Sequence, residues 1–289
     1  MKMEKNLYID ASHPNETRIV LKSNDIIEEY EYEDKNNLNF KNNIYLATIS
    51  RVEPSLQAAF VNFGRERHGF LAFNDIQSDY YQLPFEDKEK IRIAEEKIRE
   101  ELKDKTVEIN QDSSTTVSFH ESKDEKIENN IESNDSLEKK NNFHERVKSS
   151  YGIKKYKIQE VIKPGQVILI QVIKEERGQK GAALTTFISL AGKYLVLMPN
   201  TPKGGGISRK IFNSTDRQKI RSILNKIEIP NSMGIIVRTA GANKTKNEIE
   251  KDFENTLKTW EDIKQKALNS NAPSLVYEEG DIIKRTIRD

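Results

Sequence analysis

The sequence predicts an α+β protein in which strands outnumber helices. Residues 43–73 read as short strands broken by tight turns. Residues 167–176, VILIQVIKEE, form a β-branched run that is typical of a strand. The apolar residues of 247–268 instead recur at helical spacing, which predicts one long helix with Trp260 as a core anchor.

Composition limits both the size of the core and the class of function. Of 289 residues, 35% are hydrophobic and 32% are charged, so part of the chain is expected to lack a packed core. The formal net charge of +1 does not by itself indicate a nucleic-acid partner. The absence of cysteine excludes disulfides and thiolate metal sites. No apolar run has the length of a signal peptide or a membrane span, so we expect a cytoplasmic protein.

The first forty residues are expected to contain strands. Residues 7–11 and 17–23 are short, partly apolar runs, and the turn former His-Pro-Asn-Glu separates them. Residues 26–34 alternate or nearly so, but the expectation for this region is two strands. The polar cluster at 34–43 suits a linker to the strands that follow.

Residues 86–150 differ from the rest of the chain. They hold 18 acidic and 13 basic residues, a net charge of −5. Residues 86–105 suit a charged helix, whereas 106–150 are rich in Ser, Asn, Glu and Lys and contain few apolar residues. Such a composition cannot bury enough apolar surface to offset the entropy lost on ordering, so we expect 106–150 to be disordered.

The second half of the chain mixes strands and helices. Residues 182–192 and 193–200 are each expected to form one strand, and 233–240 form an apolar strand. A helix is expected at about 214–227. A mixed α/β region therefore follows the strand-rich first half.

One strand places an aromatic side chain on the side that faces solvent. Side chains in residues 57–63 alternate between two faces. One face suits a small barrel core and consists of Ala59, Val61 and Phe63. Phe60 then lies on the outer face with Ala58, and base stacking on Phe60 and the nearby Phe70 would account for an exposed ring. Packing of both rings into the core is the alternative.

Two further features indicate an anionic partner. Residues 151–206 hold nine basic and three acidic residues, a net charge of +6 that would attract phosphates, although a solvated face has the same composition. The apolar strand 233–240 ends with Arg238 beside Thr239, and a guanidinium with an adjacent hydroxyl can bind a phosphate. An ordinary strand end is the alternative here.

Five sequence blocks carry a resemblance to a known family. They are IDASHPNETRIV, NIYLATISRVEPSLQAAFVNFGRERHGFLAF, KEERGQKGAALTTFISLAGKYLVLMPN, GGGISRKI and MGIIVRTAG. Through these blocks the chain resembles the N-terminal half of the ribonuclease E/G family, in its alphaproteobacterial ribonuclease E form. The most specific parts are KGAALTT, YLVLMPN and VRTAG, and the blocks spread over nearly the whole chain outside 86–150.

The resemblance implies a layout of four parts. Residues 1–38 would be strands of an incomplete RNase H-like subdomain. Residues 39–187 would form an S1-type OB-fold barrel with 86–150 as a long insertion. Residues 188–283 would form a mixed α/β 5′-sensor region, and 284–289 would begin the return to the RNase H-like subdomain.

The resemblance also implies binding residues and a partner. The aromatic residues and the lysine that hold RNA in the family's OB-fold correspond to Phe60, Phe70 and Lys180. The residues that bind a 5′-terminal monophosphate correspond to Arg238, Thr239, Val196 and Gly192. The implied partner is single-stranded RNA, preferably 5′-monophosphorylated, and the implied roles are RNA processing and mRNA decay.

The family's own chemistry is expected outside this chain. Its Mg²⁺-binding aspartates and its cysteine-based zinc link follow the part that the chain resembles, so we assign no catalytic residue, metal site or cofactor and expect the chain alone to be inactive. Adjacent Glu175 and Glu176 point to opposite faces of a strand, and the four histidines show no ligand spacing. Two alternatives stay open: a structural half that regains nuclease activity with a separately encoded catalytic half, and a non-functional remnant.

Overall fold

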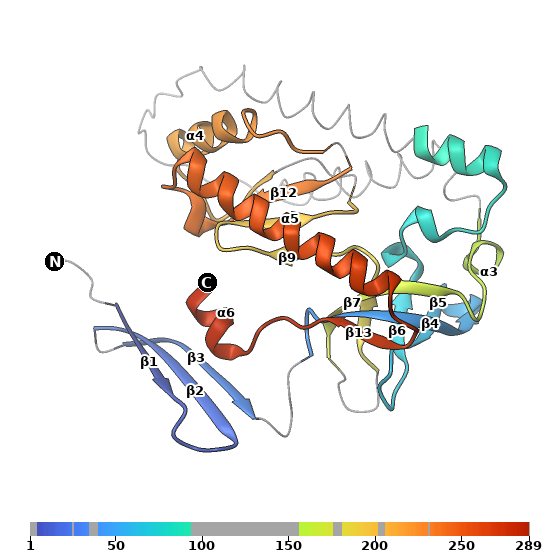
Figure 1. Ribbon diagram of the computed structural model, residues 1–289, viewed down its shortest axis with the longest axis horizontal. Helices are drawn as coiled ribbons and strands as arrows, with labels where there is room; N and C mark the ends of the chain where they lie inside the picture. Colours follow the sequence, from blue (N-terminus) through green and yellow to red (C-terminus); the bar gives the residue numbers. More distant parts are fainter. Residues whose placement is uncertain are drawn as a thin grey trace, which may run out of the picture.

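The computed structural model describes residues 5–24, 26–34, 40–93, 156–175, 181–201, 206–230 and 232–288. The insertion expected to be disordered, 106–150, and the expected RNA-binding Lys180 lie outside these residues. Figure 1 shows an N-terminal sheet, a barrel, and a second sheet with its helices. The protein is α+β, as the sequence predicts.

The first three strands form an antiparallel sheet of their own. β1 (Lys5–Asp10) pairs with β2 (Glu16–Ser23), which pairs with β3 (Ile26–Asp34). β1 and β2 match the two expected strands, whereas β3 is a third strand that the expectation did not include. The sheet buries little apolar surface, because several of its large apolar side chains are 42–71% exposed: Leu7, Tyr8, Ile9, Ile26, Ile27, Tyr30 and Tyr32.

A closed five-stranded barrel follows. Its strands, in spatial order, are β4 (Ile44–Glu53), β5 (Ala58–Asn62), β6 (Gly69–Ala72), β8 (Ala183–Thr185) and β7 (Val167–Lys174), and β7 pairs back onto β4. β6 and β8 run parallel, whereas the other neighbours run antiparallel. The connections include η1 (Pro54–Leu56), η2 (Phe73–Asp75), η3 (Ser78–Tyr80) and α3 (Ile158–Val161). This closed barrel is compatible with an OB-like fold.

The barrel interior is apolar, and the alternation of 57–63 correctly predicts which side chains enter it. Ala59, Val61 and Phe63 are at most 1% exposed and pack with residues of the other strands and of α3. Phe60 and Phe70 are half-buried and stand outside this core cluster, on the outer surface of the barrel. Ala58 differs from the prediction and is fully buried, because a methyl group is too short to rise above the neighbouring strands.

The second sheet lies beside the barrel. Its order is β11 (Gly206–Ile207), β12 (Gly234–Val237), β10 (Leu195–Met198) and β9 (Leu190–Ala191). α4 (Ser214–Leu224) connects β11 to β12, and α5 (Lys246–Leu268) follows β12 through η6 (Thr239–Gly241). α5 packs against β9, β10 and β13 (Ser274–Tyr277), and Figure 1 shows it running from the second sheet toward the barrel.

One apolar cluster joins the barrel to the second sheet. Ile44 of β4 and Val276 of β13 pack with Leu195 and Leu197 of β10 and with Trp260 of α5. β13 pairs antiparallel with the N-terminal half of β4 and so adds a sixth strand next to the barrel. Trp260 is 9% exposed, which confirms its predicted place in the core.

The last helix contacts the N-terminal sheet. In α6 (Ile282–Arg288), the backbone N–H of Ile282 donates to Oε2 of Glu33 at 3.0 Å, and the Arg285 guanidinium lies 3.6 Å from Oε1 of Glu33. Figure 1 shows α6 beside β3. No helix in the described ranges is long and apolar enough to cross a membrane.

The expectation of a single strand over 182–192 is wrong. The run forms β8 and β9, which belong to different sheets. Between them, the Thr186 hydroxyl donates to the carbonyl of Asp75 at 2.9 Å. The Asn200 side chain donates to the Thr186 carbonyl at 2.8 Å and accepts the N–H of Ile188 at 3.0 Å. Side chains distant in sequence thus satisfy the backbone that a continuous strand would pair.

Candidate functional site

Phe60 and Phe70 lie side by side on the outer surface of the barrel. They are register partners on β5 and β6, and their rings meet edge to face with centroids 6.1 Å apart. On β4, Arg51 is the register partner of Phe60, and its guanidinium carbon lies 4.8 Å from the centroid of the Phe60 ring. Three adjacent strands therefore present Arg51, Phe60 and Phe70 as one row, which we call the aromatic row.

The aromatic row combines stacking surface with positive charge. Aromatic rings can stack against bases, and an exposed guanidinium supplies donors for phosphate oxygens. Sequence reasoning missed Arg51. A bulge between Ile49 and Arg51 shifts the register of β4, so simple alternation does not show which face Arg51 occupies.

Other cations lie around the barrel surface. The turn between β5 and β6 is exposed, and its Arg65 guanidinium carbon lies 4.3 Å from the centroid of the Phe40 ring. Lys180 is outside the described residues. The chain that follows it lies next to the aromatic row, because the carbonyl of Ala182 accepts the N–H of Phe70 at 2.7 Å.

A second group of predicted residues gathers at one edge of the second sheet. Arg238 follows β12, and its Nη1 donates to the carbonyl of Gly192 at 3.1 Å. Val196 lies on β10 opposite Ile236, two residues before Arg238. Thr239 begins η6 directly after Arg238. The structure thus brings Arg238 into contact with Gly192, with Val196 on the neighbouring strand and Thr239 next along the chain. We call these four residues the turn cluster, because they lie at the turn between β9 and β10.

The turn between β9 and β10 is bound on two sides. On one side, the backbone N–H of Arg238 donates to the carbonyl of Tyr194 at 2.8 Å, next to the side-chain bond to Gly192. On the other side, the Asp252 carboxylate on α5 accepts the N–H groups of Lys193 at 3.1 Å, Tyr194 at 2.8 Å and Leu195 at 3.2 Å. Sequence reasoning missed Asp252, because only the folded chain brings α5 to the turn.

Two lysines flank the turn cluster. The ammonium nitrogens of Lys193 and Lys244 lie 5.4 Å and 5.0 Å from the centroid of the Tyr194 ring. Lys244 also pairs with Glu248 at 3.3 Å. Hydrogen bonds to Glu248 and then to Tyr194 raise the pKa of Lys244, so this lysine stays cationic at neutral pH.

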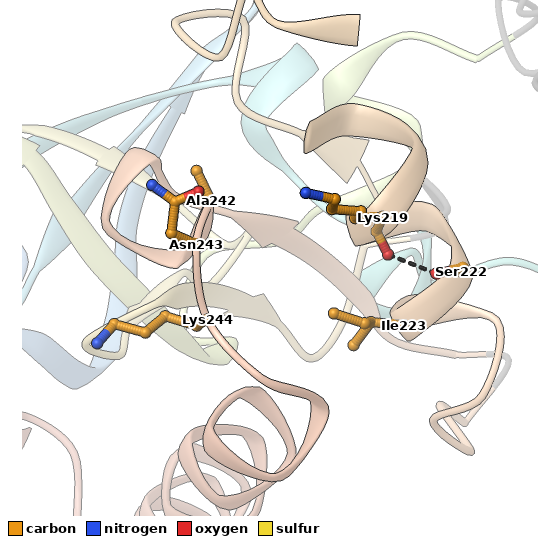
Figure 2. A pocket seen from close by; sticks show the side chains of 6 residues that line it. All are labelled: Lys219, Ser222, Ile223, Ala242, Asn243 and Lys244. Carbon is orange, nitrogen blue, oxygen red and sulfur yellow. Dashed lines mark hydrogen bonds between the residues drawn. The ribbon is translucent and has the colours of Figure 1, made fainter. Parts of the chain in front are cut away.

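A shallow pocket of about 310 Å³ opens beside the turn cluster. Figure 2 shows Lys219, Ser222 and Ile223 of α4 on one side and the chain from Ala242 to Lys244 on the other. This chain directly follows η6, which begins at Thr239. Lys219 and Lys244 therefore extend positive charge from the turn cluster toward α4.

The described residues offer no donor set for a metal ion. Within those ranges, no group of three or more His, Cys, Asp or Glu side chains has a geometry that could hold one. The Mg²⁺ and Zn²⁺ that the resemblance implies for the family therefore do not fit these residues.

Comparison with known proteins identifies relatives along the whole chain. The Ribonuclease E/G family model matches residues 189–289. Ribonuclease E of Escherichia coli (strain K12) is 35% identical over 285 residues, which is 99% of this chain and 21% of that protein. Ribonuclease E of Haemophilus influenzae is 34% identical over 287 residues, again 99% of this chain and 23% of the relative.

A shorter relative also aligns over 99% of this chain. The putative ribonuclease E of Buchnera aphidicola subsp. Baizongia pistaciae is 32% identical over 285 residues, and the chain covers 53% of its length. The chain spans only about a fifth to a quarter of the two relatives named first. The family match at the second sheet, with relatives that align over 99% of the chain, shows that the chain belongs to the ribonuclease E/G family.

Proposed function

We propose that this chain is the RNA-binding and 5′-monophosphate-sensing portion of a ribonuclease E-type endoribonuclease that acts in cytoplasmic RNA processing and mRNA decay. The aromatic row is the observation that carries the proposal. Arg51, Phe60 and Phe70 form a continuous outer surface with both stacking groups and charge. Relatives named ribonuclease E support RNA as the partner.

The proposal assigns a role to each part of the fold. Residues 39–187 are an S1-type OB-fold, for which the closed five-stranded barrel is the support. Residues 188–283 are the 5′-sensor region around the second sheet. Residues 1–38 belong to an RNase H-like subdomain, to which 284–289 return, and the contact between α6 and β3 supports that pairing.

At the barrel, single-stranded RNA is held without base-specific hydrogen bonds. Two successive bases stack on Phe60 and Phe70, each stack contributing about 1–3 kcal/mol. Arg51 binds the adjacent phosphate through its guanidinium, and Lys180 is proposed to bind another. Selection for single strands follows, because a base inside a duplex has no free face to stack.

At the turn cluster, the terminal phosphate is recognised by its charge. A 5′-monophosphate carries roughly −1.5 to −2 charges near neutral pH, as other phosphate monoesters do. Arg238 and Thr239 supply a planar guanidinium and a hydroxyl, while Gly192 and Val196 shape the surface beside them. Lys193 and Lys244 add positive charge close by. A 5′-hydroxyl end lacks the charge that these groups attract.

Binding of a short AU-rich single strand, followed by fluorescence anisotropy, tests the proposal. Phe60→Ala should weaken binding by about 1–3 kcal/mol, which is the stacking contribution of one base. Phe212→Ala is the matched control, because Phe212 is 89% exposed and lies outside the barrel, between β11 and α4. Equal losses in the two variants, or no loss at Phe60, would argue against the aromatic row as the RNA-binding surface.

A further inference from the structure

We infer that Asp252 is a positioning residue for the terminal phosphate site. The inference rests on the proposed 5′-monophosphate sensing and adds a residue to it that neither the motifs nor the resemblance assigns. Asp252 lies on α5 and acts through the turn between β9 and β10 rather than through contact with RNA.

The carboxylate is fully engaged by the turn. Its Oδ1 accepts the N–H of Lys193 at 3.1 Å, and its Oδ2 accepts the N–H groups of Tyr194 at 2.8 Å and Leu195 at 3.2 Å. Three consecutive backbone donors thus converge on one side chain, and hydrogen bonds to a charged acceptor are stronger than those to a neutral one. Asp252 therefore fixes the orientation of three consecutive peptides of the turn.

The opposite side of the same turn binds Arg238. The peptides whose N–H groups face Asp252 direct their carbonyls the other way, and the carbonyls of Gly192 and Tyr194 accept hydrogen bonds from Arg238. The carboxylate attracts the N–H end of each peptide dipole, and the guanidinium attracts the carbonyl end of the peptide that it binds. The two groups therefore strengthen each other's hydrogen bonds through the peptide between them. The position of the Arg238 guanidinium consequently depends on Asp252.

Gly192 shows how closely α5 approaches the turn. A Cβ at this position would lie 2.7 Å from Oδ2 of Asp252 and 2.9 Å from Oγ1 of Thr256. Contacts this short force one partner to move. A side chain at Gly192 would therefore displace either the turn or the Asp252 carboxylate, and in both cases would disturb the contact between them.

The test compares Asp252→Asn with Asp262→Asn, which removes an exposed carboxylate from the same helix. Each protein is titrated with two oligonucleotides of one sequence, one with a 5′-phosphate and one with a 5′-hydroxyl. The wild type should prefer the phosphate about tenfold or more, since a charge-assisted pair contributes on that order. Asp252→Asn should bring the ratio to within about twofold of one and leave 5′-hydroxyl binding unchanged, whereas Asp262→Asn keeps the ratio.

The hydrogen-exchange rates of the Lys193, Tyr194 and Leu195 amides report on the hydrogen bonds of the turn in the absence of RNA. These amides should exchange about tenfold faster or more in Asp252→Asn and be unaffected in Asp262→Asn. Gly192→Ala places a methyl group against the Asp252 carboxylate and should also speed exchange at these three amides. This measurement keeps the inference testable if Asp252→Asn fails to fold, and unchanged exchange would overturn the role of Asp252. Gly192 itself belongs to the turn cluster, so the phosphate preference of this variant does not test Asp252 separately.

The outcomes separate the inference from the proposed function. A wild type that binds both ends equally overturns 5′-monophosphate sensing and the positioning role with it. Loss of preference in Arg238→Ala but full preference in Asp252→Asn leaves sensing in place and overturns the role of Asp252. Stronger phosphate binding by Asp252→Asn also overturns it, because the three freed amides would then themselves bind the anion.

Discussion

At the scale of single residues, the position of Arg51 in the aromatic row leads to a prediction about salt. Replacing Arg51 with alanine removes one candidate phosphate contact, so the plot of log affinity against log salt should become less steep by about 0.7. Phe60→Ala should lower affinity but keep the slope, because stacking releases no counterion. RNA titrations at several salt concentrations distinguish the two variants. An unchanged slope in Arg51→Ala would mean that Arg51 does not contact phosphate in the proposed interface.

Gly69 provides a prediction about packing in the barrel. A Cβ built at Gly69 on β6 would collide with the side chain of Leu184 on β8, and both strands line the core. Gly69→Ala should therefore lower the free energy of unfolding by about 1–3 kcal/mol, as overpacking typically does. Gly165→Ala is not a suitable control, because its φ of +83° strains alanine by itself. Chemical denaturation of Gly69→Ala measures the effect, with Ser50→Ala at an exposed position of β4 as the control.

Single residues also show where sequence reasoning succeeds. The outer position of Phe60 follows from strand alternation, and the joint position of Arg238 and Thr239 follows from their adjacency. Arg51 and Asp252 do not follow from any local pattern. A bulge hides the face of Arg51, and the contacts of Asp252 join residues 57–59 positions apart.

At the scale of elements, α5 is held at its N-terminus by a capping box. The N–H of Thr245 donates to Oε2 of Glu248 at 3.0 Å, and the Thr245 hydroxyl both donates to that oxygen at 2.9 Å and accepts the N–H of Glu248 at 3.4 Å. Thr245→Ala should cost about 1 kcal/mol of stability, the usual effect of losing such a cap. Urea denaturation measures the cost, and a loss equal to that of an exposed mid-helix alanine substitution would contradict it.

The same capping box predicts a dependence on pH. The backbone N–H of Thr245 and then its hydroxyl hold the pKa of Glu248 below its ordinary value. A lowered folded-state pKa means that the stabilisation is fully present above the ordinary pKa of about 4.3 and is lost as pH falls through the lowered value. Glu248→Gln should reduce the loss of stability between about pH 5 and about pH 2, and identical pH profiles would contradict the assignment.

Elements differ in how far the sequence predicts them. The sequence predicts the long amphipathic helix α5 and the core position of Trp260, because apolar residues recur at helical spacing over many turns. β13 has only four residues and no extended alternation, so its pairing with β4 is decided by tertiary contact. The break between β8 and β9 is also tertiary, since the Asn200 side chain replaces strand partners of the backbone at Thr186 and Ile188.

At the scale of the whole molecule, Glu33 connects the two ends of the described chain. Its carboxylate accepts the N–H of Ile282 and pairs with Arg285, and both charged side chains are largely buried, with 13% and 19% exposure. Glu33→Gln should speed hydrogen exchange throughout α6, corresponding to a loss of about 1–3 kcal/mol of local protection. Glu31→Gln, at an exposed position on the same strand, is the control, and equal exchange in both variants would mean that Glu33 does not hold α6.

The pairing of β13 with β4 has a consequence for synthesis of the protein on the ribosome. The barrel strands are complete once β8 ends at Thr185. The N-terminal half of β4 then pairs with β7 on one edge, but its other edge gains β13 as a partner only when Ser274 to Tyr277 emerge, about 90 residues later. At 5–20 residues per second this interval lasts roughly 5–20 s. Throughout it a nascent chain exposes an unpaired strand edge next to Ile44, which the finished protein buries completely. Aggregation between neighbouring nascent chains is therefore favoured throughout this interval, until β13 covers the open edge of β4.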